Sequence, residues 1–149
     1  MSIQILDLVV YSHDGRIRAL PLRSGQVNII TGAGKTGKSA LISIVDYCFG
    51  ADECKVPGQI RQCVSWFGMR FQLRGGQAFI ARRCPDARAR SSQDCFFAVG
   101  DEVSISAASS LRAVTNTKGL IDLLRDWSGI SDNLHEPLPG QTRRPLSAT

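Results

Sequence analysis

The feature that most constrains this chain is a glycine-rich loop near its N-terminus, with the sequence GAGKTGKS at residues 32–39. It matches the pattern G-x-x-x-x-G-K-[ST] at every fixed position. Glycines let such a loop curl so that successive backbone N–H groups point at phosphate oxygens. A helix that begins at the end of the loop adds the positive end of its dipole. The motif therefore predicts binding of a nucleoside triphosphate, which we expect to be ATP with Mg²⁺.

The loop residues have different expected roles. Lys38 is placed to reach the β- and γ-phosphates and is the expected catalytic cation, while the Ser39 hydroxyl is the expected Mg²⁺ ligand. Lys35 and Thr36 occupy variable positions, where we expect backbone contacts only. The residues expected to contact the nucleotide here are Gly32, Ala33, Gly34, Lys35, Thr36, Gly37, Lys38, Ser39 and Ala40.

The segments on either side of the loop favour this interpretation. Residues 27–30 (VNII) are typical of a short buried strand. After the loop, apolar residues recur with helical spacing and Gly50 provides a stop; these residues are Leu41, Ile44, Val45 and Cys48. Strand, loop and helix follow one another in the order that a P-loop requires.

The remaining pattern predicts antiparallel hairpins and one further helix. Strands are expected at residues 3–10 and 16–22, joined by a turn at His13-Asp14-Gly15, with Pro21 indicating an edge strand. A second hairpin is expected from residues 63–73 to 78–82, turning at Gly75-Gly76, and a third within 95–106, turning at Gly100-Asp101. Thr117 is expected to cap a helix that Gly129 ends; its apolar residues are Leu120, Ile121, Leu124 and Trp127.

The fold class expected from these elements is α/β, a P-loop domain with antiparallel β-hairpins. Residues 1–130 are expected to form one nucleotide-binding lobe, and the proline-containing residues 131–149 an extended tail. No apolar run approaches the length of a membrane span and no signal peptide is evident, so we expect a cytoplasmic protein without a membrane partner. The five cysteines form no C-x-x-C pair, which indicates buried thiols rather than disulfides or zinc.

The charge is mildly basic, with 18 Lys and Arg against 13 Asp and Glu, a net +5. Arginines gather at Arg82, Arg83, Arg88 and Arg90, and again at Arg143 and Arg144. Two interpretations remain open for them: a solvated loop, or a surface that faces DNA or a protein partner.

A second motif invites a different interpretation. Residues 73–77 (LRGGQ) are similar to the LSGGQ signature of ABC ATPases, and residues 96–102 (FFAVGDE) to a Walker B strand that ends in Asp-Glu. We reject this miniature ABC ATPase because Arg74 replaces the signature serine and Gly100 interrupts the apolar run. The alternation of Phe67, Phe71 and Leu73 also predicts a strand, whereas a signature motif begins a helix.

The order of these elements resembles the N-terminal lobe of ABC-type ATPases of the SMC and RecN group. The strings VYSHDG at 10–15, SAL at 39–41 and DYC at 46–48 look most like an uncharacterised bacterial family of SMC-like ATPases. The resemblance implies a head split in sequence, whose C-terminal lobe carries the signature and Walker B motifs after a coiled coil. It also implies ATP-dependent dimers of heads.

The resemblance has consequences for individual residues. In such heads the segment after the first strand lies near the adenine, which corresponds to residues 11–14. Tyr11 then either stacks on the base or packs in the core. Asp46 is excluded as a Walker B acid because it lies on the predicted P-loop helix, and Gln141 is a weak Q-loop candidate.

The sequence thus predicts the ATP- and Mg²⁺-binding lobe of an SMC-like ATPase, part of a longer protein, which needs a second lobe for hydrolysis. Two alternatives stay open besides the miniature ABC ATPase. One is a self-contained small P-loop kinase. The other is a nucleotide-gated interaction module without turnover.

Overall fold

The computed structural model of the chain describes residues 3–32 and 37–128. Its framework is one antiparallel sheet in the order β2-β1-β3-β4-β5. The strands are β1 (Gln4–Ser12), β2 (Ile17–Pro21), β3 (Val64–Leu73), β4 (Gly76–Arg83) and β5 (Cys95–Gly100). The helices are α1 (Ala40–Cys48), α2 (Gly58–Arg61) and α3 (Thr117–Ser128), with a 3₁₀ turn, η1 (Ala108–Ser110). The expected mixed α/β class with antiparallel hairpins is therefore correct.

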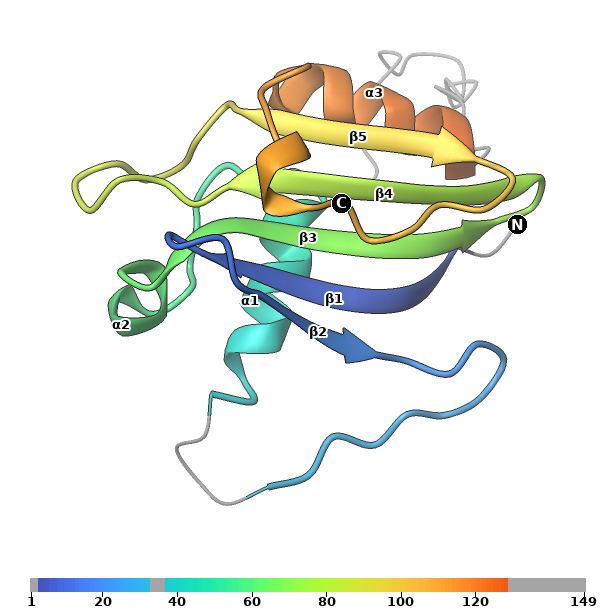
Figure 1. Cartoon of the computed structure of the whole chain (residues 1–149), viewed down its shortest axis with the longest axis horizontal. Helices are drawn as coiled ribbons and strands as arrows, with labels where there is room; N and C mark the ends of the chain where they lie inside the picture. Colours follow the sequence, from blue (N-terminus) through green and yellow to red (C-terminus); the bar gives the residue numbers. More distant parts are fainter. Residues whose placement is uncertain (1–2, 33–36, 129–149) are drawn as a thin grey trace, which may run out of the picture.

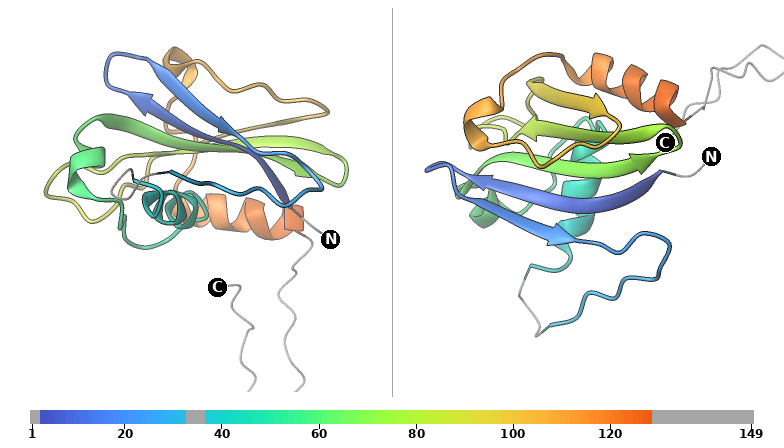
Figure 2. Two further views of the ribbon diagram at one scale, coloured as in Figure 1. Left: turned by 90° about the horizontal axis from the view of Figure 1, so that it is seen from below. Right: turned by 45° about the vertical axis from the view of Figure 1, so that its right-hand side comes forward.

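Both long helices cover the same face of the sheet. Figure 2 shows α1 and α3 together on one side, with the segment around η1 on the other. Alternation along β3 directs Phe67, Met69 and Phe71 into the core beneath the helices, where all three are fully buried. Residues spaced by a helical turn on α3 complete this core: Leu120 and Leu124 are buried, and the Trp127 ring lies 5.9 Å from that of Phe71.

A second, smaller core lies on the opposite face. Buried Val9, Tyr11, Trp66 and Phe79 pack there against the segment that runs from Val103 to Leu111. Burial on both faces explains why the central strands β3 and β4 carry apolar residues on both of their faces.

Several local predictions are confirmed. The β1–β2 hairpin turns at residues 13–15, and β2 is an edge strand that ends at Pro21. Helix α3 lies where it was expected, but its cap is Asn116, whose Oδ1 accepts the Gly119 N–H at 2.8 Å, and the predicted cap Thr117 is the first helical residue. The residue that follows Phe49 at the end of α1 is Gly50, with φ +100°, and a Cβ atom there would lie 2.7 Å from Cγ1 of Ile121. A glycine is thus needed at this position for its backbone angle and for the close approach of α3.

Two hairpin predictions are wrong in detail. Leu73 pairs with Gly76, so the two-residue turn between β3 and β4 is Arg74-Gly75 rather than Gly75-Gly76. The hairpin within 95–106 lacks its second strand, because the chain leaves the sheet after Gly100 to cover the second core. There the Val103 N–H donates to Gln77 Oε1 at 3.0 Å instead of to a neighbouring strand.

The burial of the cysteines gives a test of this fold. Cys63 is exposed, whereas Cys48, Cys54, Cys84 and Cys95 are buried and none is in a disulfide. Burial raises the pKa of the Cys84 thiol to about 11, so roughly 0.1% of it is thiolate at pH 8. We expect one thiol per native chain to react rapidly with a chromogenic disulfide reagent at pH 8, and all five in denaturant. Cys63→Ser should remove the rapid phase; two or more rapid thiols would contradict the burial of the other four cysteines.

Candidate functional site

We call the glycine-rich segment of residues 32–39 the phosphate loop, after its predicted ligand. Its described part ends in a turn that leads directly into α1. Gly37 has φ +83°, a conformation that favours glycine. Its carbonyl accepts the Ala40 N–H at 3.0 Å, and the Lys38 carbonyl accepts the Leu41 N–H at 3.2 Å. The loop positions Ala33, Gly34, Lys35 and Thr36 lie outside the described residues.

Lys38 links the two ends of the loop. Its side chain is partly buried, and its ammonium group donates a hydrogen bond to the carbonyl oxygen of Gly32. The ammonium group therefore lies against the start of the loop at an exposed position. An ammonium group held against a neutral carbonyl has no charge partner there, so an anion can replace that contact.

The N-terminus of α1 has no side-chain cap, although its Ala40 and Leu41 N–H groups are paired with the turn before it. Ser39 occupies the N-cap position, yet its side chain makes no capping hydrogen bond and is exposed. The first turn carries no acidic residue. The hydroxyl and the positive end of the helix dipole are thus both available to a ligand.

The strand that we predicted before the loop is absent from the structure. Residues 27–30 form no strand, and Val27 and Ile29 are 90% and 81% exposed. Figure 1 shows this segment leaving the sheet after β2 and returning to α1. It is held only locally, since the Asn28 side chain bonds the N–H and carbonyl of Arg23. An apolar strand needs a neighbouring strand for its backbone groups, and none lies beside this segment among the described residues.

The far end of α1 is anchored to β4 by Arg82 and Tyr47, both fully buried. Arg82 Nη1 donates to the carbonyls of Tyr47 (2.9 Å) and Ala51 (2.6 Å). The Tyr47 hydroxyl donates to the Arg83 carbonyl at 2.7 Å. Burial raises the pKa of Tyr47 to about 12, partly offset by the charge of Arg82, so this hydroxyl keeps its proton at neutral pH.

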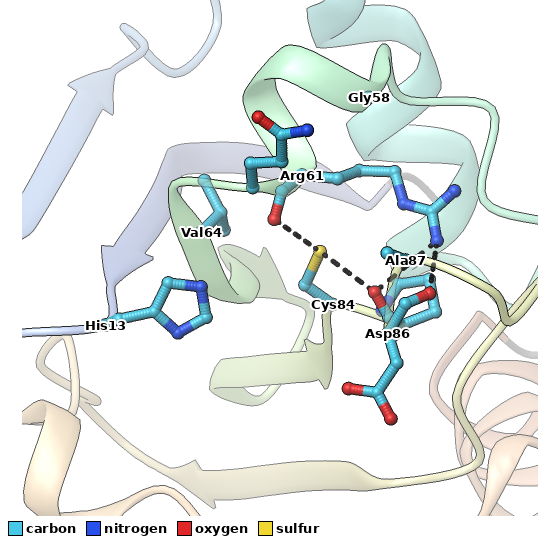
Figure 3. Close-up of a pocket in the computed structure, with 9 residues that line it drawn as sticks. His13, Gly58, Arg61, Val64, Cys84, Asp86 and Ala87 are labelled. Carbon is cyan, nitrogen blue, oxygen red and sulfur yellow. Dashed lines mark hydrogen bonds between the residues drawn. The ribbon is translucent and has the colours of Figure 1, made fainter.

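A cavity of about 320 Å³ lies beside α2. Three segments form most of its walls: the β1–β2 turn with His13, helix α2 with the Gln62 that follows it, and residues 84–87 after β4; Val64 of β3 also lines the cavity. Figure 3 shows the His13 ring on one side of the cavity and the Asp86 carboxylate on another. Arg61 secures the third wall, because its Nη2 donates to the carbonyls of Asp86 (3.0 Å) and Ala89 (2.8 Å).

The turn that carries His13 is stabilised by its own polar residues. The Ser12 hydroxyl donates to the Asp14 carboxylate, and Arg16 Nε lies 2.8 Å from Asp14 Oδ2. The bond from Ser12, followed by the backbone N–H and charge of Arg16, holds the pKa of Asp14 below its usual value. His13 is therefore presented to the cavity on an ordered turn.

The structure also corrects the predicted role of Tyr11 beside the base. Its ring is fully buried in the second core, and its hydroxyl donates to the Ser106 carbonyl at 2.6 Å. Alternation along β1 directs Tyr11 and Ser12 to opposite faces of the sheet. Of the two interpretations of Tyr11, core packing is the one that the geometry allows, and stacking on a base is wrong.

Arg82 also departs from the expected arginine surface. It is fully buried and cannot face DNA, while neighbouring Arg83 pairs with Asp94 at 3.1 Å and lies over the Trp66 ring. Arg143 and Arg144 lie outside the described residues, as do Gln141 and all of 131–149.

The residues of the rejected ABC motif do not converge on the loop. Residues 73–77 make the β3–β4 turn, and Asp101 and Glu102 follow the edge strand β5, at the opposite edge of the sheet from β2. Asp46 lies on α1, as predicted. Within residues 3–32 and 37–128, no three His, Cys, Asp or Glu side chains gather into a metal site. No helix in the same part of the chain is long and apolar enough to cross a membrane.

Comparison with known proteins found no matching family model and no significant match among curated proteins. The candidate site therefore rests on the residues themselves. The contacts of Arg61 were not predicted, and the sequence placed Arg82 in a solvated or partner-facing cluster although it is buried. The alternation of Ala78, Ile80 and Arg82 was the available signal, since it places Arg82 on the buried face beneath α1.

Proposed function

We propose that this chain is the ATP- and Mg²⁺-binding lobe of a split, SMC-like ATPase head, within a P-loop fold that a second lobe completes. The observation that carries the proposal is the contact from Lys38 to the Gly32 carbonyl across the loop, next to the uncapped start of α1. In a triphosphate complex, Lys38 would exchange this carbonyl for phosphate oxygens. The Ser39 hydroxyl would hold Mg²⁺, which neutralises the phosphates.

The cavity beside α2 supplies a place for the base. A Cβ atom at Gly37 would lie 3.8 Å from Cδ1 of Ile60, so α2 touches the end of the phosphate loop. The same short helix lines the cavity with Gly58 and Arg61. A nucleotide whose phosphates lie on the loop can therefore direct its base toward His13, which replaces Tyr11 as the base-side candidate. The cavity volume, about 320 Å³, suits a nucleobase and little more.

Exposed apolar residues next to the loop favour a second lobe. Val27, Ile29 and Ile30 precede the loop, and Ile42 is exposed in the first turn of α1. Isolated apolar residues are common on surfaces, but a strand-like segment without a partner indicates a missing neighbour. A second lobe that adds strands beside residues 27–30 would pair their backbone and cover these side chains.

The nucleotide-gated module without turnover is the second candidate. It is favoured by the same exposed segment, which binding at the loop can reposition, and it needs no hydrolytic residue. The small kinase has less support: the cavity beside α2 is assigned to the base, and a second cavity of about 250 Å³, lined by Ser43, Asp46 and residues from the segment 51–55, lies toward the end of α1 away from the loop.

Replacing Lys38 with Ala tests the binding proposal. We expect MgATP affinity to fall at least about tenfold, because hydrogen bonds to charged groups contribute roughly 1.5–3 kcal/mol each. Titration calorimetry measures the change. Lys118→Ala removes the same charge from the exposed start of α3 and should bind like the wild type. Equal affinity of Lys38→Ala and wild type would remove Lys38 from the site.

Ser39→Ala separates metal binding from helix stability. We expect it to weaken ATP binding in the presence of Mg²⁺ by about tenfold and to change metal-free binding little, because only the metal complex uses the hydroxyl. Ser43→Ala, one turn further along α1, is the matched control. A parallel loss with and without Mg²⁺ would assign Ser39 a structural role.

The chain alone should bind ATP but turn it over negligibly. Phosphoryl transfer requires charges on several sides of the γ-phosphate, and this lobe supplies one side. Steady-state phosphate release should lie orders of magnitude below the roughly 1–100 per second of typical kinases, with Lys38→Ala as the contamination control. Rapid turnover that is lost in Lys38→Ala and also in Asp101→Asn or Glu102→Gln would restore the miniature ABC ATPase.

A further inference from the structure

Arg82 is a fully buried cation that pairs with no carboxylate in the part of the chain that the structure describes. Its guanidinium lies 3.9 Å from the centroid of the Tyr47 ring, and its Nη2 is buried without a hydrogen-bond partner among the described residues. A buried charge is expensive to desolvate, and an apolar side chain of similar volume often serves stability at least as well. The arrangement is therefore better explained by what Arg82 connects than by stability alone.

The bonds of Arg82 join two segments that are distant in sequence. Nη1 binds the carbonyls of Tyr47 and Ala51 at the end of α1, and Nε donates to the Ser92 carbonyl at 3.0 Å. Tyr47 makes the same connection a second time, because its hydroxyl accepts the Ser92 N–H at 3.0 Å. The helix that begins at the phosphate loop is thus fastened to the loop of residues 84–94.

The loop of residues 84–94 forms one wall of the cavity beside α2. Its other supports are also fixed: Arg61 of α2 binds the carbonyls of Asp86 and Ala89, and the Cys54 N–H donates to the Arg90 carbonyl at 2.8 Å. Arg82 is, together with Tyr47, a buried link between this loop and α1. It touches neither the cavity nor the phosphate loop.

We propose that Arg82 is a positioning residue that fixes the base-side wall of the cavity relative to the helix of the phosphate loop. The proposal rests on the proposed function, since it assumes that phosphates and base occupy these two places. A loosened wall raises the entropy lost when the base is ordered, while the phosphate loop keeps its own contacts. Loss of Arg82 should therefore weaken binding of a ligand with a base and leave a ligand of phosphates alone unaffected.

The experiment compares MgATP with magnesium tripolyphosphate on the full chain, by calorimetry well below the unfolding temperature. In Arg82→Lys and Arg82→Met, we expect ATP affinity to fall about fivefold or more, the lower end of ordinary coupling between two sites, with tripolyphosphate affinity unchanged. Tyr47→Phe removes the second connection but keeps the ring, and should shift the ratio of affinities in the same direction by less. If Arg82→Met does not fold, Arg82→Lys and Tyr47→Phe decide the matter.

Arg70→Lys is the control for a purely structural effect. Arg70 is a partly buried arginine that pairs with Asp7 at 2.6 Å and donates to the Val103 carbonyl of the segment over the second core. The Arg70→Lys variant should be less stable than the wild type, with an unchanged ratio of MgATP affinity to tripolyphosphate affinity. An unchanged ratio in the folded Arg82 variants, or a parallel loss of both ligands, overturns the inference while wild-type binding stands. Failure of the wild type to bind either ligand overturns the proposed function, and this inference with it.

Discussion

The packing of α1 on the central strands is the constraint on which the rest of the structure depends. Ile44, Tyr47 and Cys48 face β3 and β4, where Phe67, Met69 and Ile80 are fully buried. This contact sets the direction of the helix, and the direction of the helix sets where the phosphate loop emerges. The far end of α1 is fixed as well, because Gly50 admits Ile121 of α3 at close range. Both the loop and the cavity beside α2 are consequences of this one packing arrangement.

The two faces of the sheet are closed by different means. Helices cover one face, and their apolar residues need only the right spacing to reach the core. The other face is covered by an irregular segment whose backbone groups must find partners individually. Three side chains of the sheet provide such partners. Arg70 donates to the Val103 carbonyl and Gln77 accepts the Val103 N–H. The Tyr11 hydroxyl donates to the Ser106 carbonyl. A polar residue on this face therefore indicates a segment crossing the sheet rather than a ligand site, which is why Tyr11 belongs to the core.

The sequence pattern predicted the elements whose positions depend on residues close together in the chain. The β1–β2 turn, the edge position of β2, the stop at Gly50 and the helix from Thr117 all follow from spacing and from residue types that single conformations require. Register was harder: Gly75 and Gly76 both permit a turn, and only the pairing of Leu73 with Gly76 distinguishes the two. The contacts of Arg82 could not be predicted, because they depend on carbonyls of α1 and of the loop after β4 that only the folded chain brings together.

The failure of residues 27–30 to form a strand is the most informative difference, because it is a failure of context and not of propensity. β-Branched residues favour strands when their side chains pack and their backbone groups pair. Here the sheet ends at β2, and residues 27–30 do not pair with that edge. Neither condition is therefore met, and Val27 and Ile29 remain in solvent. The absence of this strand also matters for the proposed phosphate site. In a P-loop protein the strand before the loop fixes one end of the loop while the helix fixes the other. With only α1 in place, the contact from Lys38 to the Gly32 carbonyl ties the end that lacks a strand to the end that has a helix. Under the proposed function, a lobe held in this way would bind the phosphates from the helix end, and positioning them for transfer would require a neighbouring strand that fixes the other end.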